Sequence, residues 1–335
     1  MNLIKTISIQ IIILLMALEF FSFVLTSFNL LIFNEKPIYF KKNHDGEIWR
    51  NTNLDIGPWH NISVSTRHVK TCFDVNYSSN NIGARDNKNY YSKTYEQSIV
   101  LIGDSFAEGY GVKLEKTFSK LIEKKLKKNV INLGSSGSDP QHNHLRFEKF
   151  TKDKKFEEII YLFFPLNDFI RKESSNKKKE KEGILIKNSL EEIRDFLTNF
   201  TYSFNTLRTV KFLILNKDKS FGNQSYQYKD KESIDYTFNF ISKVMQLKNK
   251  KKTLIIIPAK KDMRFNQSNK NYKNLYWFKE LELMSQKLDF KLIDLNDVFN
   301  IKNINEYFHS CDGHWSTYGN SAAAEHFLSH RKYQK

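Results

Sequence analysis

Short apolar runs alternate with amphipathic stretches through the middle of the chain. Three runs rich in buried-type residues indicate strands, at 98–103 (SIVLIG), 130–133 (VINL) and 158–164 (EIIYLFF). Between them, apolar residues recur at helical spacing over 114–128 and 141–153. Strands and helices in this alternation are typical of a parallel sheet covered by helices on both faces.

The alternation is interrupted and then resumes. Residues 172–183 form a charged loop, and helical patterns follow at 188–216 and 231–249. We therefore predict a helical insertion over about 172–252 that packs beside the sheet. The first pattern then continues with a strand at 253–259, a helix at 275–288, a strand at 290–295 and a last helix at about 317–330.

A long apolar stretch occupies the N-terminus. Residues 6–33 contain one charged side chain, that of Glu19. As a helix this stretch would be roughly 42 Å long, whereas the hydrocarbon core of a bilayer is ~30 Å thick. A cleaved signal peptide would have a shorter apolar region and a small-x-small cleavage site, and none is evident before Asn34. We predict a transmembrane anchor over 1–33, with a signal peptide and a buried soluble helix as alternatives.

Residues 34–97 and the overall composition bear on the domain organisation and on the binding partners. Residues 34–97 are polar with few clear periods, and we predict an irregular lead-in segment packed on the domain that follows, 98–335. With 40% hydrophobic residues the chain can bury a sizeable core. A net charge of +16 is compatible with a nucleic acid, an anionic lipid or a polysaccharide as partner. Because most of the basic residues are lysines rather than arginines, we favour a solvated basic surface and expect no nucleic-acid partner.

Four short segments contain the residue types of a catalytic site. They are GDSF (103–106), NLGSSG (132–137) and PLND (165–168), each directly after a predicted strand, and CDGHW (311–315) before the last helix. Taken singly, each is an ordinary turn or cap. Because the carboxyl ends of parallel strands meet at one edge of a sheet, we expect the segments to share one crevice. A serine, small-residue turns, an amide and an Asp–His pair are together the groups that acyl transfer needs.

These segments resemble the four blocks of the SGNH (GDSL-type) hydrolase superfamily, which contain Ser, Gly, Asn and His in that order. They match as Ser105, Gly137, Asn167 and His314 over about residues 98–330. The resemblance implies an α/β, flavodoxin-like three-layer sandwich with strand order 2-1-3-4-5. The stretch NNIGARD (80–86) is also similar to the N-x-x-G-x-R lead-in of a membrane-anchored bacterial branch of the superfamily.

The resemblance also implies a role for each matched residue. Ser105 would be the nucleophile, His314 the general base and Asp312 its partner. The backbone N–H groups of Ser105 and Gly137, with the side chain of Asn167, would form the oxyanion hole. Nothing in the sequence calls for a cofactor or a metal, since there is no HExxH motif and no cluster of Cys and His. Two histidines in the 141–153 helix, His142 and His144, could approach the crevice, but a solvated helix face is the preferred interpretation.

The spacing of the Asp–His pair bears on the substrate. Secreted esterases of the superfamily usually have D-x-x-H, whereas this chain has D-x-H-W at 312–315, which is similar to the branch that acts on cell-envelope polysaccharides. We therefore expect a membrane-anchored serine esterase or deacylase that cleaves an ester, expected to be O-acetyl, on an envelope glycan. An O-acyltransferase with the same triad is the first alternative. A non-catalytic glycan-binding domain is the second.

The side of the membrane is a separate question. Lys36, Lys41, Lys42 and Arg50 follow the apolar stretch, so the positive-inside count does not favour an outside C-terminal domain. The resemblance to envelope enzymes nevertheless predicts a single-pass protein whose catalytic domain is periplasmic or extracellular. In an oxidising compartment Cys72 and Cys311 could pair and hold the loop of the Asp–His pair. Two buried free thiols are the alternative.

Overall fold

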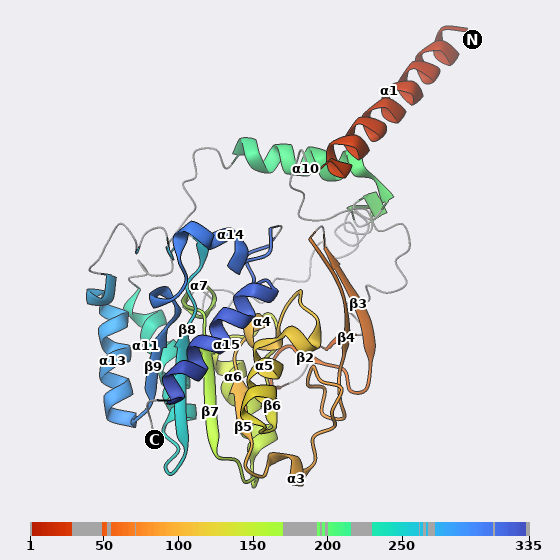
Figure 1. Cartoon of the computed structure of the whole chain (residues 1–335). Coiled ribbons are helices and arrows are strands. Elements are labelled where there is room, and N and C mark those ends of the chain that lie inside the picture. Colours follow the sequence, from red (N-terminus) through yellow and green to blue (C-terminus); the bar gives the residue numbers. More distant parts are fainter. Residues whose placement is uncertain are drawn as a thin grey trace.

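The computed structural model describes most of the chain. The described residues are 2–28, 49–51, 55–70, 72–169, 193–194, 196–197, 200–215, 230–260, 262–263, 266, 272–310 and 312–332, without the side chains of 2, 3, 69, 209, 212–215 and 332. Figure 1 shows a parallel sheet at the centre, with helices on both faces and α1 (Asn2–Ser27) extending away from it.

A five-stranded parallel sheet forms the centre of the molecule. Its strands are β5 (Ile99–Ile102), β6 (Val130–Asn132), β7 (Glu158–Phe163), β8 (Lys251–Ile256) and β9 (Lys291–Asp294). Their order in space is β6-β5-β7-β8-β9, and every neighbouring pair is parallel. This is the order 2-1-3-4-5, so the predicted flavodoxin-like topology is confirmed. All four residues of β5 are buried because helices cover both of its faces.

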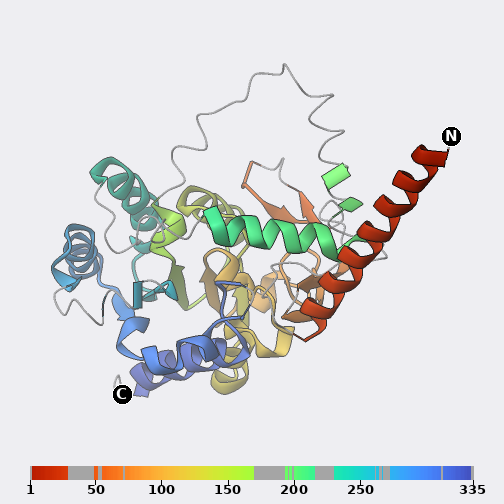
Figure 2. The same ribbon diagram turned by 90° about the horizontal axis from the view of Figure 1, so that it is seen from above.

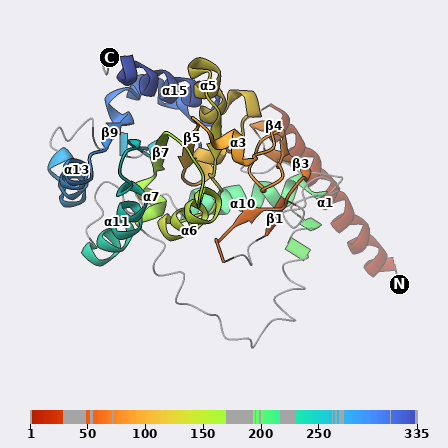
Figure 3. The same cartoon turned by 90° about the horizontal axis from the view of Figure 1, so that it is seen from below.

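Two helix layers complete the sandwich, as Figures 2 and 3 show. One layer consists of α6 (Pro140–Thr151), α11 (Lys231–Met245) and α13 (Tyr276–Leu288), and the other of α5 (Phe118–Leu126) and α15 (Thr317–Lys332). Alternate residues of β5 enter the two cores: Val100 packs in the cluster of the first layer, and Leu101 in that of the second. The side-chain alternation of the strands thus separates two apolar cores.

Two of the elements whose boundaries differ from the predicted ones show the physical reason for the difference. The helix predicted from residue 114 begins at Phe118, because Thr117 caps it and Leu114–Lys116 form a 3-10 turn. The strand predicted at 253–259 runs over Lys251–Ile256 and ends before Pro258. The charged loop predicted at 172–183 lies outside the described residues.

The lead-in contains more regular structure than the sequence predicts. Two short strands, β1 (Arg50–Asn51) and β2 (Trp59–His60), pair antiparallel, and β3 (Ser65–Lys70) and β4 (Phe73–Ser78) form a hairpin. Helix α3 (Ser92–Tyr95) follows. In β4, Val75 and Tyr77 are buried while Asp74 and Asn76 are exposed, which is the alternation of a half-buried strand.

Helix α1 packs against α10 (Tyr202–Leu215), a part of the predicted insertion. Residues Ile4–Ser27 are long and apolar enough to cross a membrane, although a signal sequence would meet the same test. The Glu19 carboxylate accepts from the backbone N–H groups of Tyr202 (2.6 Å) and Ser203 (3.0 Å). Thus the one charge of the apolar stretch lies at the N-terminus of α10, where partial positive charge favours it.

The insertion therefore has two separate environments. Its second helix, α11, packs against α6 and α13 beside the sheet, whereas α10 packs against α1. In Figures 1 and 2, α10 and α1 lie beyond the end of the sheet at which β5 is followed by α4 (Ser105–Glu108).

Candidate active site

The residues after β5 form a sharp strand-to-helix turn. A Cβ atom at Gly103 (φ +154°) would lie 2.9 Å from the backbone oxygen of Leu162 in β7, so only glycine fits this close approach. Asp104 caps α4 by accepting from the backbone N–H of Phe106 at 3.0 Å. Ser105 is thereby placed as the first residue of the helix, at the carboxyl edge of the sheet.

The structure brings the predicted Ser, His and Asp together. His314 Nε2 lies 2.6 Å from Ser105 Oγ, and His314 Nδ1 is hydrogen-bonded to Asp312 Oδ1. A carboxylate only accepts, so Nδ1 bears the proton and Nε2 accepts from the serine hydroxyl. The backbone N–H of His314 also donates to Asp312 Oδ1, at 3.0 Å. This is the arrangement that activates a serine by general-base catalysis.

Aromatic side chains hold the imidazole of His314 in place. The ring of Tyr110 stacks on it with a centroid separation of 4.1 Å, and Phe106 packs at 5.1 Å. Ser105 is 3% exposed, and the His314 side chain is 24% exposed. The site is therefore shielded on most sides but still reachable from solvent.

The three predicted oxyanion donors follow three neighbouring strands. Asn167 lies in α7 (Pro165–Asp168) after β7, and its Nδ2 donates to Asp104 Oδ2 at 3.1 Å. An amide has two N–H donors, so a second one remains. Gly137 follows β6 with φ +79° and is exposed. Within the described residues, the backbone N–H groups of Ser105 and Gly137 donate to no protein acceptor.

A buried carboxylate that the sequence reasoning missed supports the Gly137 loop. Glu108, 2% exposed at the end of α4, accepts from both the N–H and the hydroxyl of Ser136. His60 Nε2 lies 3.5 Å from Glu108, and Arg50 donates to the Ser136 carbonyl. Burial disfavours the charge, but His60, Arg50 and Ser136 hold the pKa of Glu108 well below its ordinary value. Both backbone polar groups of Ser136, the residue before Gly137, are thus hydrogen-bonded.

The N-x-x-G-x-R stretch has a structural explanation. The Asn80 side chain accepts from the backbone N–H groups of Ile82 and Ala84, closing a turn in which Gly83 has φ +84°. The turn directs Arg85 inward, where its guanidinium donates to the carbonyls of Glu108, Gly109 and Val112. This motif therefore supports the end of the helix that begins with Ser105.

The interpretation of His142 and His144 as a solvated helix face is wrong for His144. Its ring packs against Phe240, with centroids 5.9 Å apart, because α11 covers α6. Burial lowers the pKa of His144 from its ordinary value. His142 lies beside Gly57 and within 3.1 Å of Asp139.

Two further observations concern ligands and thiols. Among the described residues, no group of three or more His, Cys, Asp or Glu side chains is placed to hold a metal ion.

Cys72 is disulfide-bonded, and the chain has one other cysteine, Cys311, which lies outside the described residues.

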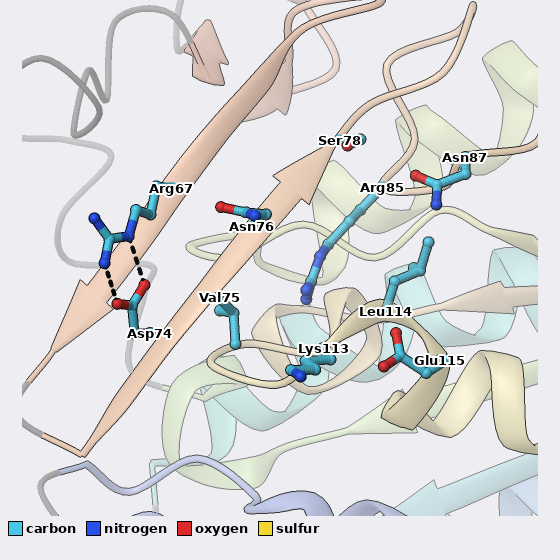
Figure 4. A pocket seen from close by; sticks show the side chains of 10 residues that line it. All are labelled: Arg67, Asp74, Val75, Asn76, Ser78, Arg85, Asn87, Lys113, Leu114 and Glu115. Carbon is cyan, nitrogen blue, oxygen red and sulfur yellow. Dashed lines mark hydrogen bonds and ion pairs between the residues drawn. The ribbon is translucent and has the colours of Figure 1, made fainter.

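A polar hollow of about 470 Å³ lies between the hairpin and residues 113–115, and residues of both line it. Figure 4 shows its lining, including the ion pair of Arg67 and Asp74. None of Ser105, Asp312 and His314 lines it. The hollow therefore has no part in the chemistry described here.

No family model and no curated protein matches the chain. Among solved structures, it is similar to a lipolytic protein of the G-D-S-L family from Veillonella parvula (11% identity, 69% and 96% of the two chains covered, TM-score 0.38). It is also similar to a psychrotrophic esterase from Pseudoalteromonas sp. (12% identity, 71% of this chain and 99% of the other covered, TM-score 0.39). A third similar structure is an acetyl xylan esterase (17% identity, 69% of this chain and 98% of the other covered, TM-score 0.39). Because these TM-scores are below 0.5, we base the assignment of function on this chain's own residues.

The position of Asn167 leads to a test of its role. Asn167→Ala is expected to lower kcat for an acetyl aryl ester by roughly 10²–10³ with little change in KM, because an oxyanion donor acts only in the transition state. The melting temperature of the variant is the control, since Asn167 also bonds Asp104. A change confined to KM would assign the amide to substrate binding instead.

Proposed function

We propose that this chain is a membrane-anchored serine esterase or deacylase that removes an ester-linked acyl group, in particular O-acetyl, from a cell-envelope glycan. The observation that carries the proposal is the continuous hydrogen-bond chain from Asp312 through His314 to Ser105 at the carboxyl edge of the sheet. Three potential oxyanion donors follow the adjacent strands, which supports acyl chemistry rather than glycan binding alone.

The proposed reaction has two stages. Ser105 Oγ attacks the ester carbonyl while its proton passes to His314 Nε2, and the oxyanion is bound by the N–H groups of Ser105, Gly137 and Asn167. The C–O bond to the alcohol then breaks, and the alcohol leaves with the proton from His314. Water then attacks the carbonyl of the acyl-enzyme while its proton passes to His314. The bond to Ser105 Oγ breaks, His314 returns the proton to the serine, and free acid is released.

The substrate class is inferred from the Asp–His block. The D-x-H-W spacing at 312–315 is similar to that of the superfamily branch acting on envelope polysaccharides. The net charge of +16 favours approach to an anionic envelope surface. We further propose the division into an anchor (1–33), a lead-in (34–97) and a hydrolase domain (98–335). Arg50 and Arg85 make the lead-in an integral support of that domain.

We also propose that the hydrolase domain lies outside the cytoplasmic membrane. The disulfide bond of Cys72 supports this side, because disulfides persist in oxidising compartments. Helix α1 provides the anchor.

The assignment of the nucleophile is tested with a fluorophosphonate probe. The wild-type chain should be labelled, whereas Ser105→Ala should not, because the probe reacts with an activated serine hydroxyl. Asp312→Asn should be folded but labelled more slowly by several orders of magnitude, since His314 loses the acceptor that sets its tautomer. Equal labelling of the wild type and Ser105→Ala would refute the assignment.

Hydrolysis and transfer differ in what attacks the acyl-enzyme. An acetyl aryl ester is supplied to the full chain in detergent, with and without oligosaccharide acceptors, and acetate and acetylated sugar are both measured. Hydrolysis predicts acetate release at a rate that the acceptor leaves unchanged, because only water is positioned for attack. Acetylated sugar formed at the expense of acetate would assign the transferase reaction instead.

The proposed topology is tested by a fusion of alkaline phosphatase at residue 40. The enzyme folds only where its disulfides form, so an active fusion is expected. A β-galactosidase fusion at the same residue is the matched control and should be inactive. The reverse pattern would place the hydrolase domain in the cytoplasm.

A further inference from the structure

A lysine from the hairpin reaches the proposed catalytic aspartate. Lys70 is the last residue of β3, and its Nζ donates to Asp312 Oδ2 at 2.7 Å. The other carboxylate oxygen, Oδ1, bonds the ring and the backbone N–H of His314. The two oxygens of Asp312 thus have different partners, a cation on one and the imidazole on the other.

This ion pair is shielded from water. The Lys70 and Asp312 side chains are 23% and 11% exposed, whereas those of Arg67 and Asp74, in the same hairpin, are 51% and 48% exposed. A shielded pair interacts more strongly than an exposed one, which solvent screens. Burial opposes the charge of Lys70, but Asp312 and Tyr110 raise its pKa, so the ammonium form is retained.

Lys70 is also linked to the imidazole of His314 through the ring of Tyr110. Its Nζ lies 5.4 Å from the ring centroid of Tyr110, and this ring stacks on His314. A cation here offsets the negative charge that Asp312 presents to the imidazole. It therefore disfavours a second positive charge on His314.

We propose that Lys70 is a positioning residue of the triad, which orients Asp312 through Oδ2 and keeps His314 in its neutral, basic form at lower pH. This inference rests on the proposed function. The side chain of Lys70 contacts Asp312 and Tyr110 rather than Ser105, so it acts through those two residues.

Other polar groups around His314 remain constant in the test. His309 donates its backbone N–H to the His314 carbonyl, and Lys260 donates to the carbonyl of His309 at 3.4 Å. Burial lowers the pKa of His309 from its ordinary value, which favours the neutral imidazole. With Asp312, Tyr110 and Ser105, these are the titratable and charged groups facing His314 among the described residues. Replacing Lys70 alone therefore isolates its effect.

The experiment measures the rate of fluorophosphonate labelling of Ser105 against pH, with the full chain in detergent. Lys70→Gln keeps a donor for Asp312 and removes the charge, so the acidic limb of the profile is expected to move up by about 0.5–1 pH unit. The shift is upward because the neutral imidazole is the base, and without the cation it takes a proton at higher pH. On the alkaline plateau the rate should fall less than about tenfold, since the triad hydrogen bonds remain.

Two variants act as controls. Lys70→Arg retains the cation and should restore the wild-type limb. Arg67→Met removes a cation from the outer face of the same strand and should leave the profile unchanged. Lys70→Gln with the wild-type limb, or an equal shift in Arg67→Met, would refute the role of Lys70 alone. No labelling of the wild type at any pH would refute the triad and this inference with it.

Discussion

The buried carboxylate of Glu108 joins three parts of the molecule. It ends the helix that begins with Ser105, accepts two hydrogen bonds from Ser136 in the Gly137 loop, and lies 3.5 Å from His60 of the lead-in. An ionised group without partners in such a place would cost several kcal/mol. The chain avoids this cost when the helix that begins with Ser105, the Gly137 loop and the lead-in are assembled together. The buried charge of Glu108 therefore helps to fix the positions of these three parts relative to one another.

This constraint explains why the lead-in is a structural part of the site. Arg85 donates to the carbonyls at the end of the nucleophile helix, and Arg50 donates to the peptide bond before Gly137. Lys70 reaches Asp312 from the same segment. The helix that begins with Ser105, the Gly137 loop and Asp312 are thus each held by a different basic residue of the lead-in. In the proposed reaction the four blocks provide the reacting groups, and the lead-in supports the segments that contain them.

The sequence predicts the features that have a period or a fixed position. The strands β5, β6 and β7 are visible because their mainly apolar runs are buried on both faces, and Ser105, Gly137 and Asn167 are found because each lies in the turn after such a run. The hairpin was missed, although the FDVNYS alternation of β4 indicates it. The pair of Lys70 and Asp312 joins residues 242 positions apart and has no periodic signal. Likewise, the role of Glu108 cannot be predicted from the sequence, because its partners His60 and Ser136 are distant from it along the chain.

The path of the chain also bears on the position of the apolar helix α1. The polypeptide leaves the sheet after β7, next to Asn167, and returns at β8; between them lies α10, whose N-terminus meets Glu19 of α1. Both α10 and α1 lie beyond the carboxyl edge of the sheet (Figures 1 and 2). A carboxylate in an apolar span needs polar partners, and the backbone N–H groups of α10 provide them. The contact at Glu19 therefore holds α1 against the N-terminus of α10.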